Sequence, residues 1–423
     1  MSASRASRLV GWKAIGAFLG RDARTAKRWE AERRLPVHRM PGGRRPTVWA
    51  DPDELDIWIA GSRTAEPEAV PVTRRAIATV SALSAVAAHI ASQARFSDLE
   101  AAPYADAPAA RDLYLNAQYA AGRRTAAGLD VAGATYTALA RRYPSRATAF
   151  AGLAECHLLS REFGVAGERE AYAAASTCAA RARALAPQSA DALRALGFIA
   201  FWGSADVGQG LGLLREAVAL APQNARARHW LATALGARGA FAAALAEIEA
   251  ARRLDPQSTS ILADRALVQF AAGERAAGRA ALEQLTEIAP DFSATHAYLG
   301  QMDLIEGRDA DFPRRLEAEG RLRGDQDAID LSRRLLGVLR DAGAGAMRRA
   351  YAEAQQLLHR SGQISAFQVA RSWAAAGDLD SASVWLGICR DRAEPHLVAA
   401  AGDVLLNVSL RGRPGFEAFR RLV

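Results

Sequence analysis

A repeat of 34 residues in the middle of the chain restricts the fold more than any other feature of the sequence. Prolines and glycines keep this spacing in two series, Pro187, Pro222, Pro256 and Pro290, then Gly239, Gly273 and Gly307, with one step of 35 between the first two prolines. A constant period of this length predicts a repeat protein. Each unit is then one supersecondary element that buries its apolar face only by stacking on its neighbours.

The stretch 225–258 indicates what one unit contains. Its first half places Trp230, Leu231 and Leu235 on one helical face, and its second half does the same with Ile248 and Leu254. A glycine between the halves predicts a turn, and the proline that follows predicts the end of the second helix. A generic alanine-rich helical domain is the alternative, but it would not keep prolines, glycines and apolar positions in one register.

This helix-turn-helix unit and its period resemble tetratricopeptide (TPR) repeats. The resemblance implies an α-solenoid with a concave and a convex face, and we expect it over residues 110–423. We also expect a degenerate helix pair at 326–360 and another pair at 365–390 that turns at Gly377. The tail LRGRPGFEAFRRLV resembles the capping end of the same family.

The basic charge of the chain is concentrated at its N-terminus. The first 50 residues contain twelve basic and three acidic side chains, a formal charge of +9, whereas the whole chain of 423 residues carries +8. A codon bias toward arginine would act along the whole chain and does not explain this asymmetry. A positive field confined to one end predicts a polyanionic partner there.

Residues 1–61 read as a small separate domain. Residues 11–19 predict a short helix with Ile15 and Phe18 facing inward, and Asp22 is a suitable N-cap for a second helix at 23–32. Two short extended stretches then flank the flexible pair Gly42-Gly43, which predicts a wing. Residues 51–54 open a third helix.

The stretch GWKAIGAFLGRDARTAKRWEAERRLPVHRMPGGRRPTVWADPDELDIWI closely resembles the excisionase-like, MerR-like winged helix-turn-helix domain. In bacteria this domain often precedes TPR repeats. The resemblance implies that the second helix enters the major groove of DNA while wing arginines contact the backbone. The residues assigned to DNA are Arg21, Arg24, Thr25, Lys27, Arg28, Arg39, Arg44 and Arg45.

Residues 62–109 read as a joint between the two domains. It contains nineteen residues, 76–94, without an acidic or permanently charged side chain. Their length nearly suffices for a bilayer, and Arg74-Arg75 would suit a cytoplasmic N-terminal side. The apolar content is thin, however, so a single membrane span and an alanine-rich connecting helix both stay open.

The repeat region carries no pattern for catalysis. A phosphate-binding loop, a dinucleotide fingerprint and metal-spaced histidines are all missing from the sequence, and the three cysteines sit singly in helical patterns. We therefore expect no enzyme activity, no cofactor and no metal. We expect instead a protein or peptide partner on the concave face, at first-helix positions Phe198, Phe201, Trp202, His229, Thr233, Phe270 and Gln301.

These observations predict a mainly α protein with a small N-terminal winged helix-turn-helix and a C-terminal TPR-type α-solenoid. The function we expect is a cytoplasmic, DNA-binding transcriptional regulator that binds duplex DNA as a homodimer, because one small module buries little DNA surface. An inner-membrane tether through 76–94 would follow if that segment spans. The alternative is a TPR interaction scaffold whose N-terminal module has an accessory or architectural role.

Overall fold

The computed structural model describes residues 9–19, 23–33, 35–40, 47–52, 54–55, 104, 106–162, 167–392, 394–413 and 416–417. The chain divides into two compact units, Met1–Ser97 and Asp98–Val423. The boundary between the units lies inside the stretch that the sequence marks as a joint.

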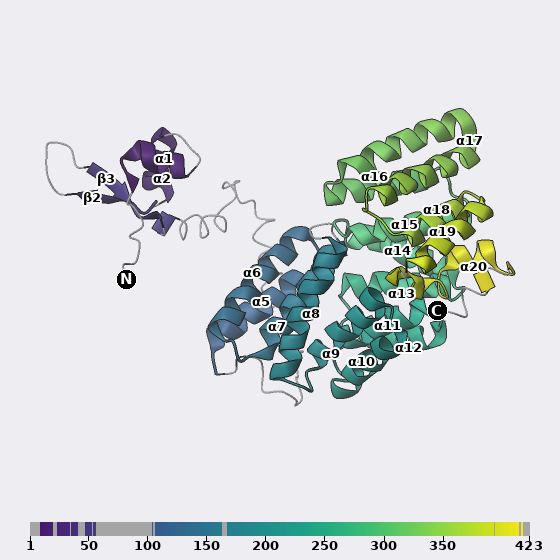
Figure 1. The fold of residues 1–423 in the computed structure, drawn as a ribbon, viewed down its shortest axis with the longest axis horizontal. Coiled ribbons are helices and arrows are strands. Elements are labelled where there is room, and N and C mark those ends of the chain that lie inside the picture. Colours follow the sequence, from purple (N-terminus) through teal and green to yellow (C-terminus); the bar gives the residue numbers. More distant parts are fainter. Residues whose placement is uncertain are drawn as a thin grey trace. The chain divides into compact units, whose positions relative to one another are not determined.

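The small unit combines two short helices with a three-stranded sheet. Its elements are β1 (Leu9–Val10), α1 (Trp12–Phe18), α2 (Ala23–Arg33), β2 (His38–Met40) and β3 (Thr47–Ala50), drawn in purple in Figure 1. The sheet has the order β1-β3-β2 and is antiparallel, with Trp49 of β3 opposite Val10 on one side and His38 on the other.

A small apolar core joins the helices to the sheet. Ile15 of α1, Ala26 of α2, Val48 of β3 and Leu55 are buried together. Phe18, the last residue of α1, is 38% exposed, so its predicted inward position is wrong.

The large unit is built from consecutive helical hairpins (Figure 1). Its helices are α5 (Pro108–Gly122), α6 (Ala126–Arg142), α7 (Ala147–Glu162), α8 (Glu168–Leu185), α9 (Ala190–Phe198), α10 (Val207–Leu220), α11 (Ala225–Ala237), α12 (Phe241–Leu254), α13 (Thr259–Ala271), α14 (Arg275–Ile288), α15 (Ser293–Glu306), α16 (Phe312–Arg323), α17 (Gln326–Arg360), α18 (Ala366–Ala375) and α19 (Leu379–Asp391). Each odd-numbered helix from α5 to α15 packs on the even-numbered helix after it, and each pair packs on the next. The predicted TPR-like solenoid is confirmed by this arrangement.

The periodic glycines and prolines act as the sequence predicts. Gly239 and Gly273 adopt φ of +74° and +104°, which L side chains rarely take, and each makes the turn between the two helices of a pair. Pro256 and Pro290 follow the ends of α12 and α14. Along the seam, Ile248 and Leu282 are fully buried, whereas Leu254 at the last position of α12 is exposed and does not belong to the inward face.

The C-terminal end keeps the pairing with altered geometry. The backbone of α17 breaks at Gly343, with φ of +83°, so this element is two helices meeting at the predicted GAGAM turn. α18 and α19 turn at Gly377, also at positive φ. Phe416, from the tail that resembles a TPR cap, is buried against α18 and α19.

Two further helical elements follow α19. They are η2, a 3-10 helix (Pro395–Ala399), and α20 (Val404–Leu410), drawn in yellow in Figure 1. Among the described residues, no helix combines the length and the apolar character that a membrane span requires. The segment 76–94 lies outside the described residues.

Candidate functional site

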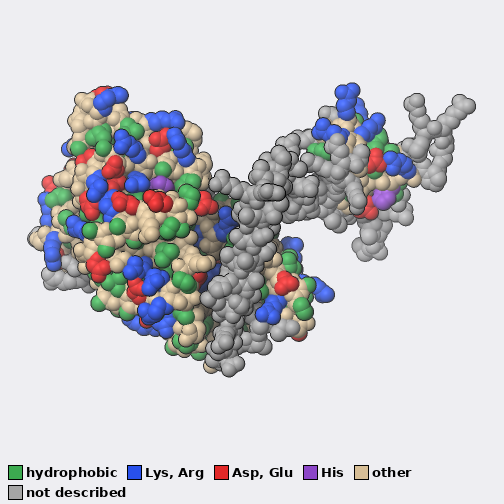
Figure 2. All heavy atoms as spheres, turned by 180° about the vertical axis from the view of Figure 1, so that it is seen from behind, with side chains coloured by type: hydrophobic (Ala, Val, Ile, Leu, Met, Phe, Trp, Pro, Cys, Tyr) green, Lys and Arg blue, Asp and Glu red, His purple; other side chains and the backbone are tan. Residues whose placement is uncertain are grey.

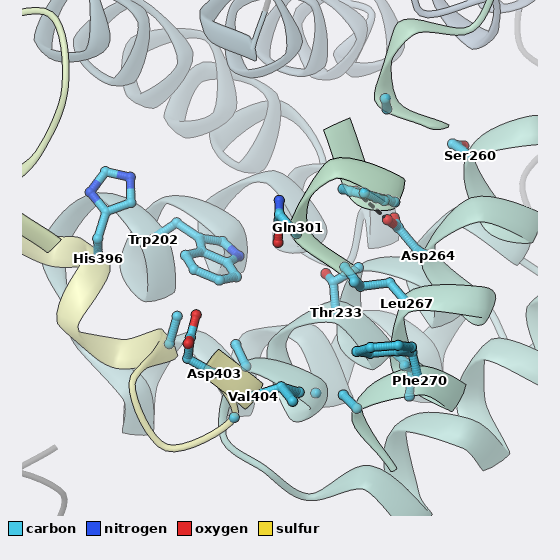
Figure 3. Close-up of a pocket in the computed structure, with 18 of the residues that line it drawn as sticks. Trp202, Thr233, Ser260, Asp264, Leu267, Phe270, Gln301, His396, Asp403 and Val404 are labelled. Atoms are coloured by element: carbon cyan, nitrogen blue, oxygen red, sulfur yellow. Dashed lines mark hydrogen bonds between the residues drawn. The ribbon is translucent and has the colours of Figure 1, made fainter. Parts of the chain in front are cut away.

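The inner helices of the solenoid surround a cavity of about 430 Å³. Its walls come mainly from α7, the end of α9 and the residues just after it, α11, α13, α15 and α18, together with the segment that follows α19. Figure 3 shows Trp202, Thr233 and Gln301 pointing toward the same space, with Asp403 and Val404 at its edge. This volume lies within the range of about 300–1,000 Å³ that is usual for ligand sites.

The structure brings together all but one of the residues that the sequence assigns to the concave face. Those that line the cavity are Phe198, Trp202, His229, Thr233, Phe270 and Gln301. Phe201 does not line it and is completely buried, so its assignment was wrong.

A local change of helix type explains the position of Phe201. Residues Ile199–Gly203 form a π-helix, η1, which widens the turn and shifts the phase of the side chains after α9. Phe201 therefore turns away from the concave face and packs on Gly210 of α10, where a β-carbon would lie 2.7 Å from the Phe201 β-carbon. Trp202, one residue later, reaches the cavity instead.

Three side chains from successive first helices form a hydrogen-bonded row on one wall. His229 of α11 lies with its Nε2 2.6 Å from Asp264 Oδ2, and the Tyr298 hydroxyl of α15 donates to Asp264 Oδ1 at 2.6 Å. Burial raises the pKa of Asp264, but the hydrogen bonds from His229 and Tyr298 and the nearby positive charges outweigh it, so the pKa is lowered overall. The row therefore holds an ionised carboxylate with two partners.

A second polar group lies on the opposite side, at α18. Arg371 pairs with Asp403, with 2.7 Å between Nε and Oδ2, and its Nη2 donates to Gln301 Oε1 at 3.0 Å. Asp403 also accepts from the Leu406 amide at the start of α20. Sequence reasoning missed Asp264, Tyr298, Arg371 and Asp403, although the first two recur at nearly the repeat spacing from His229.

The segment Pro395–Leu410, here named the C-terminal strap, forms part of the cavity wall. Val398 is buried among residues of α11, including Trp230 and Leu235. The Gly402 amide donates to the Ala237 carbonyl at 2.9 Å, and a β-carbon at Gly402 would overlap the carbonyl oxygen of Gly236. The strap thus joins the middle of the solenoid to α18 near its end, a contact that no repeat pattern predicts.

A buried ion cluster fixes the helices behind the cavity. Glu155 of α7 lies 2.9 Å from Arg194 of α9 and 3.1 Å from Arg226 of α11. Burial opposes ionisation of Glu155, but the two guanidinium groups prevail and lower its pKa to about 2. The Arg194 guanidinium also lies 4.7 Å from the ring centre of Trp230, which lines the cavity.

The small unit presents cationic side chains on α2. Arg24, Lys27 and Arg28 are exposed, Thr25 is half-buried, and Ala26 is turned into the core. Lys and Arg side chains gather over the small unit in the space-filling view (Figure 2). Arg21, Arg44 and Arg45 lie outside the described residues.

Arg39, which the sequence assigns to the wing, and its neighbour His38 are both paired within the small unit. Arg39 of β2 lies 2.6 Å from Glu30 of α2, while remaining about half exposed. His38 stacks on Trp49, with 4.5 Å between ring centres, and its Nε2 lies 2.6 Å from Glu54 Oε2. The first pair ties β2 to α2, and the second ties β2 to β3 and to Glu54.

The cysteines and acidic groups do not gather into a metal-like cluster in the part of the chain that the structure describes. The three cysteines are free thiols; Cys156 and Cys389 are buried and Cys178 is half-buried. Burial raises the pKa of the Cys156 thiol to about 12. Such thiols are poor nucleophiles at neutral pH.

No protein-family model matches the chain, and a search of curated proteins finds no similar one. Solved structures give distant likenesses. PilF of Pseudomonas aeruginosa is 18% identical over 49% of this chain and 97% of its own, with a TM-score of 0.35. Yeast Tom70 is 13% identical over 88% of this chain and 78% of its own, with a TM-score of 0.38.

A human IFIT1 dimer bound to PPP-AAAA is 16% identical over 64% of this chain and 69% of its own, with a TM-score of 0.40. Likenesses at this level say nothing about what the present chain binds. The assignment of a TPR-like solenoid therefore depends on the paired helices, the 34-residue period and the positive-φ glycines of the chain itself.

Proposed function

We propose that the large unit is an interaction module whose concave cavity binds a short segment of a protein partner. The observation that carries this proposal is the ligand-sized cavity, lined by aromatic and hydrogen-bonding side chains from successive first helices. Stacked helical repeats commonly use such a concave surface for binding. Catalysis is not part of the proposal, since a binding role needs only the fixed, partly polar lining.

Site-directed photo-crosslinking in the native host tests this proposal. A photoreactive amino acid replaces Trp202 or Gln301 on the cavity wall in the full-length chain. Matched controls carry it at Tyr119 or Val384, both 62% exposed and away from the cavity. We expect the two cavity positions to crosslink to the same peptide segment of one protein, and the controls to leave that segment unlabelled. Different segments from the two cavity positions, or equal labelling from the controls, would refute it.

We further propose that the small unit is a winged helix-turn-helix that binds duplex DNA, which would make the protein a transcriptional regulator acting as a homodimer. The specific support is the division of α2 into a buried side with Ala26 and an exposed side with Arg24, Lys27 and Arg28. An exposed helix with this charge fits the phosphate-lined major groove.

The DNA proposal predicts strong salt dependence. Binding of the full-length chain to random-sequence duplex DNA should weaken steeply with salt, with a slope of log K against log salt of roughly −0.9 for each phosphate neutralised. A flat response would contradict the proposal. A chain that lacks DNA affinity yet still crosslinks its partner through the cavity would support the alternative of an interaction scaffold.

A further inference from the structure

We propose that the group entering the cavity is an uncharged aromatic side chain of the partner segment. The inference rests on the proposed function of the large unit and names the chemistry that its cavity accepts. Three features of the wall carry it: aromatic surfaces, compensated charges, and hydrogen-bonding groups that are neutral.

Aromatic rings form part of the apolar wall, beside aliphatic side chains. Phe198 and Trp202 lie with their ring centres 6.2 Å apart, and Phe198 is 4.7 Å from Trp230. Phe270 and Leu267 of α13 continue this surface on the other side, and Figure 3 shows both beside the same space. Aromatic groups pack favourably on such walls in tilted or offset geometry.

The charged groups on the wall are already compensated inside the protein. Asp264 holds His229 and Tyr298, and Arg371 holds Asp403. Arg161, another charged residue of the wall, contacts the Tyr172 hydroxyl at 2.5 Å and the Glu168 carboxylate at 3.4 Å.

Arg124 completes the set of charged lining residues. Its positive charge lowers the pKa of both Asp264, which also lines the cavity, and the buried Glu155. A charged ligand would therefore lose its hydration without gaining an uncompensated partner. A neutral ligand avoids that cost.

Neutral hydrogen-bonding groups remain at the edge of the aromatic surface. Gln301 accepts from Arg371 through its carbonyl oxygen, which leaves the N–H donors of its amide group at the cavity. Thr233 of α11 points into the same space (Figure 3), and its hydroxyl, which donates to the Trp230 carbonyl at 2.9 Å, can still accept a hydrogen bond. An aromatic side chain with a polar edge, such as an indole or a phenol, matches this combination, and the cavity volume suits one or two such groups.

Two fluorescent probes with one ring skeleton test the charge preference on the full-length protein. N-phenyl-1-naphthylamine is neutral, and 8-anilino-1-naphthalenesulfonate adds one anionic group. We expect saturable one-to-one binding of the neutral probe that is at least about tenfold tighter than binding of the anionic probe. Equal or tighter binding of the anionic probe would overturn the proposal.

A cavity-filling substitution tests the location. Thr233→Trp should reduce binding of the neutral probe at least about tenfold, because the new side chain occupies the aromatic space. Thr286→Trp is the matched control, since Thr286 lies on α14, away from the cavity, and should leave binding unchanged. Unchanged probe binding in Thr233→Trp, with the circular dichroism spectrum of the parent chain, would also overturn the proposal.

The crosslinked partner segment tests whether the aromatic group in the cavity belongs to a protein partner. Synthetic peptides of that segment should displace the neutral probe, and replacement of their aromatic residue by Ala or by Asp should abolish displacement. If the neutral probe binds more tightly but the Trp202 and Gln301 positions crosslink to no common segment, the interaction proposal fails. In that case the preference of the cavity for neutral aromatic groups is retained, and the ligand is a free aromatic molecule. If a segment crosslinks but its aromatic residue can be replaced without loss, the present inference fails and the interaction proposal stands.

Discussion

The two units of this chain use arginine in opposite ways. In the small unit, Arg24 and Arg28 lie exposed on one side of α2. In the large unit, Arg194 and Arg279 are buried, and each reaches a carboxylate on a neighbouring helix. In Figure 2, basic and acidic side chains alternate over the large unit, whereas Lys and Arg predominate over the small one.

This difference shows that the same residue type can hold helices together or be available to bind a partner. A guanidinium buried against a carboxylate holds helices in one relative position, but the carboxylate compensates its charge, which is therefore not offered to a partner. Cations exposed on a helix surface contribute little to folding, and their positive field can act on a polyanion. Net charge by itself, +8 for the whole chain, does not reveal this division.

Removal of the buried carboxylate should have the largest effect. Glu155→Ala removes the buried carboxylate between Arg194 and Arg226 and leaves Arg194 with only the partly exposed Asp191, 3.3 Å away. It should lower the free energy of unfolding by about 3–5 kcal/mol, measured by urea denaturation of the full-length chain. An effect below about 1 kcal/mol would contradict the contrast between the two units.

Acid should remove a similar contribution without mutation. Because the pKa of Glu155 is lowered to about 2 in the folded protein, against about 4.3 when unfolded, its contribution is fully present above pH 4.3. It should be lost as pH falls toward 2, by roughly 3 kcal/mol in total. Urea denaturation of the parent chain and of Glu155→Gln across pH 5 to 2 should show the smaller pH dependence in the variant; parallel curves would refute the assignment.

The exposed cations should matter for DNA rather than for stability. Arg24→Ala/Arg28→Ala should weaken binding to duplex DNA by about tenfold or more and lower the salt slope by roughly 0.9 for each phosphate that is no longer neutralised. Arg141→Ala/Arg142→Ala in the large unit is the control with the same charge change. Fluorescence anisotropy of labelled duplex measures both, and equal weakening in the two variants would remove the assigned role of α2.

Removal of an exposed ion pair in the large unit should have the smallest effect on the free energy of unfolding. Arg321 lies 2.6 Å from Glu317 on the same helix, but its side chain is 67% exposed. Arg321→Ala should change the free energy of unfolding by at most about 0.5 kcal/mol in urea denaturation. A cost near that of Glu155→Ala would mean that burial does not govern the strength of these pairs.

Local sequence signals predicted the helical pairs well. Gly239 and Gly273 mark turns because few other residues accept their backbone angles, and Pro256 marks a helix end because it lacks an amide hydrogen. Such signals act within one or two turns of chain, so they can be read from the sequence alone. The same helical spacing placed His229 and Thr233 of α11 on the cavity wall.

Features that depend on distant residues or on helix type were not predictable. The π-helix at Ile199–Gly203 places Phe201 away from the concave face, and no sequence signal in the preceding residues predicts the widened turn. The Glu155–Arg226 pair joins residues 71 apart, outside any single repeat. The strap joins Gly402 to Ala237 by a contact between distant segments that have no period in common.

That strap changes how the solenoid should unfold. In an open stack of repeats each unit touches only its neighbours, so the last helices can fray one pair at a time. Here the chain returns from α19 and fastens its end to α11, which ties α18 to a helix more than 130 residues earlier. Loss of the final pair would also release the middle of the stack. The C-terminal half should therefore exchange its amide hydrogens as one cooperative block, rather than in order from the end inward.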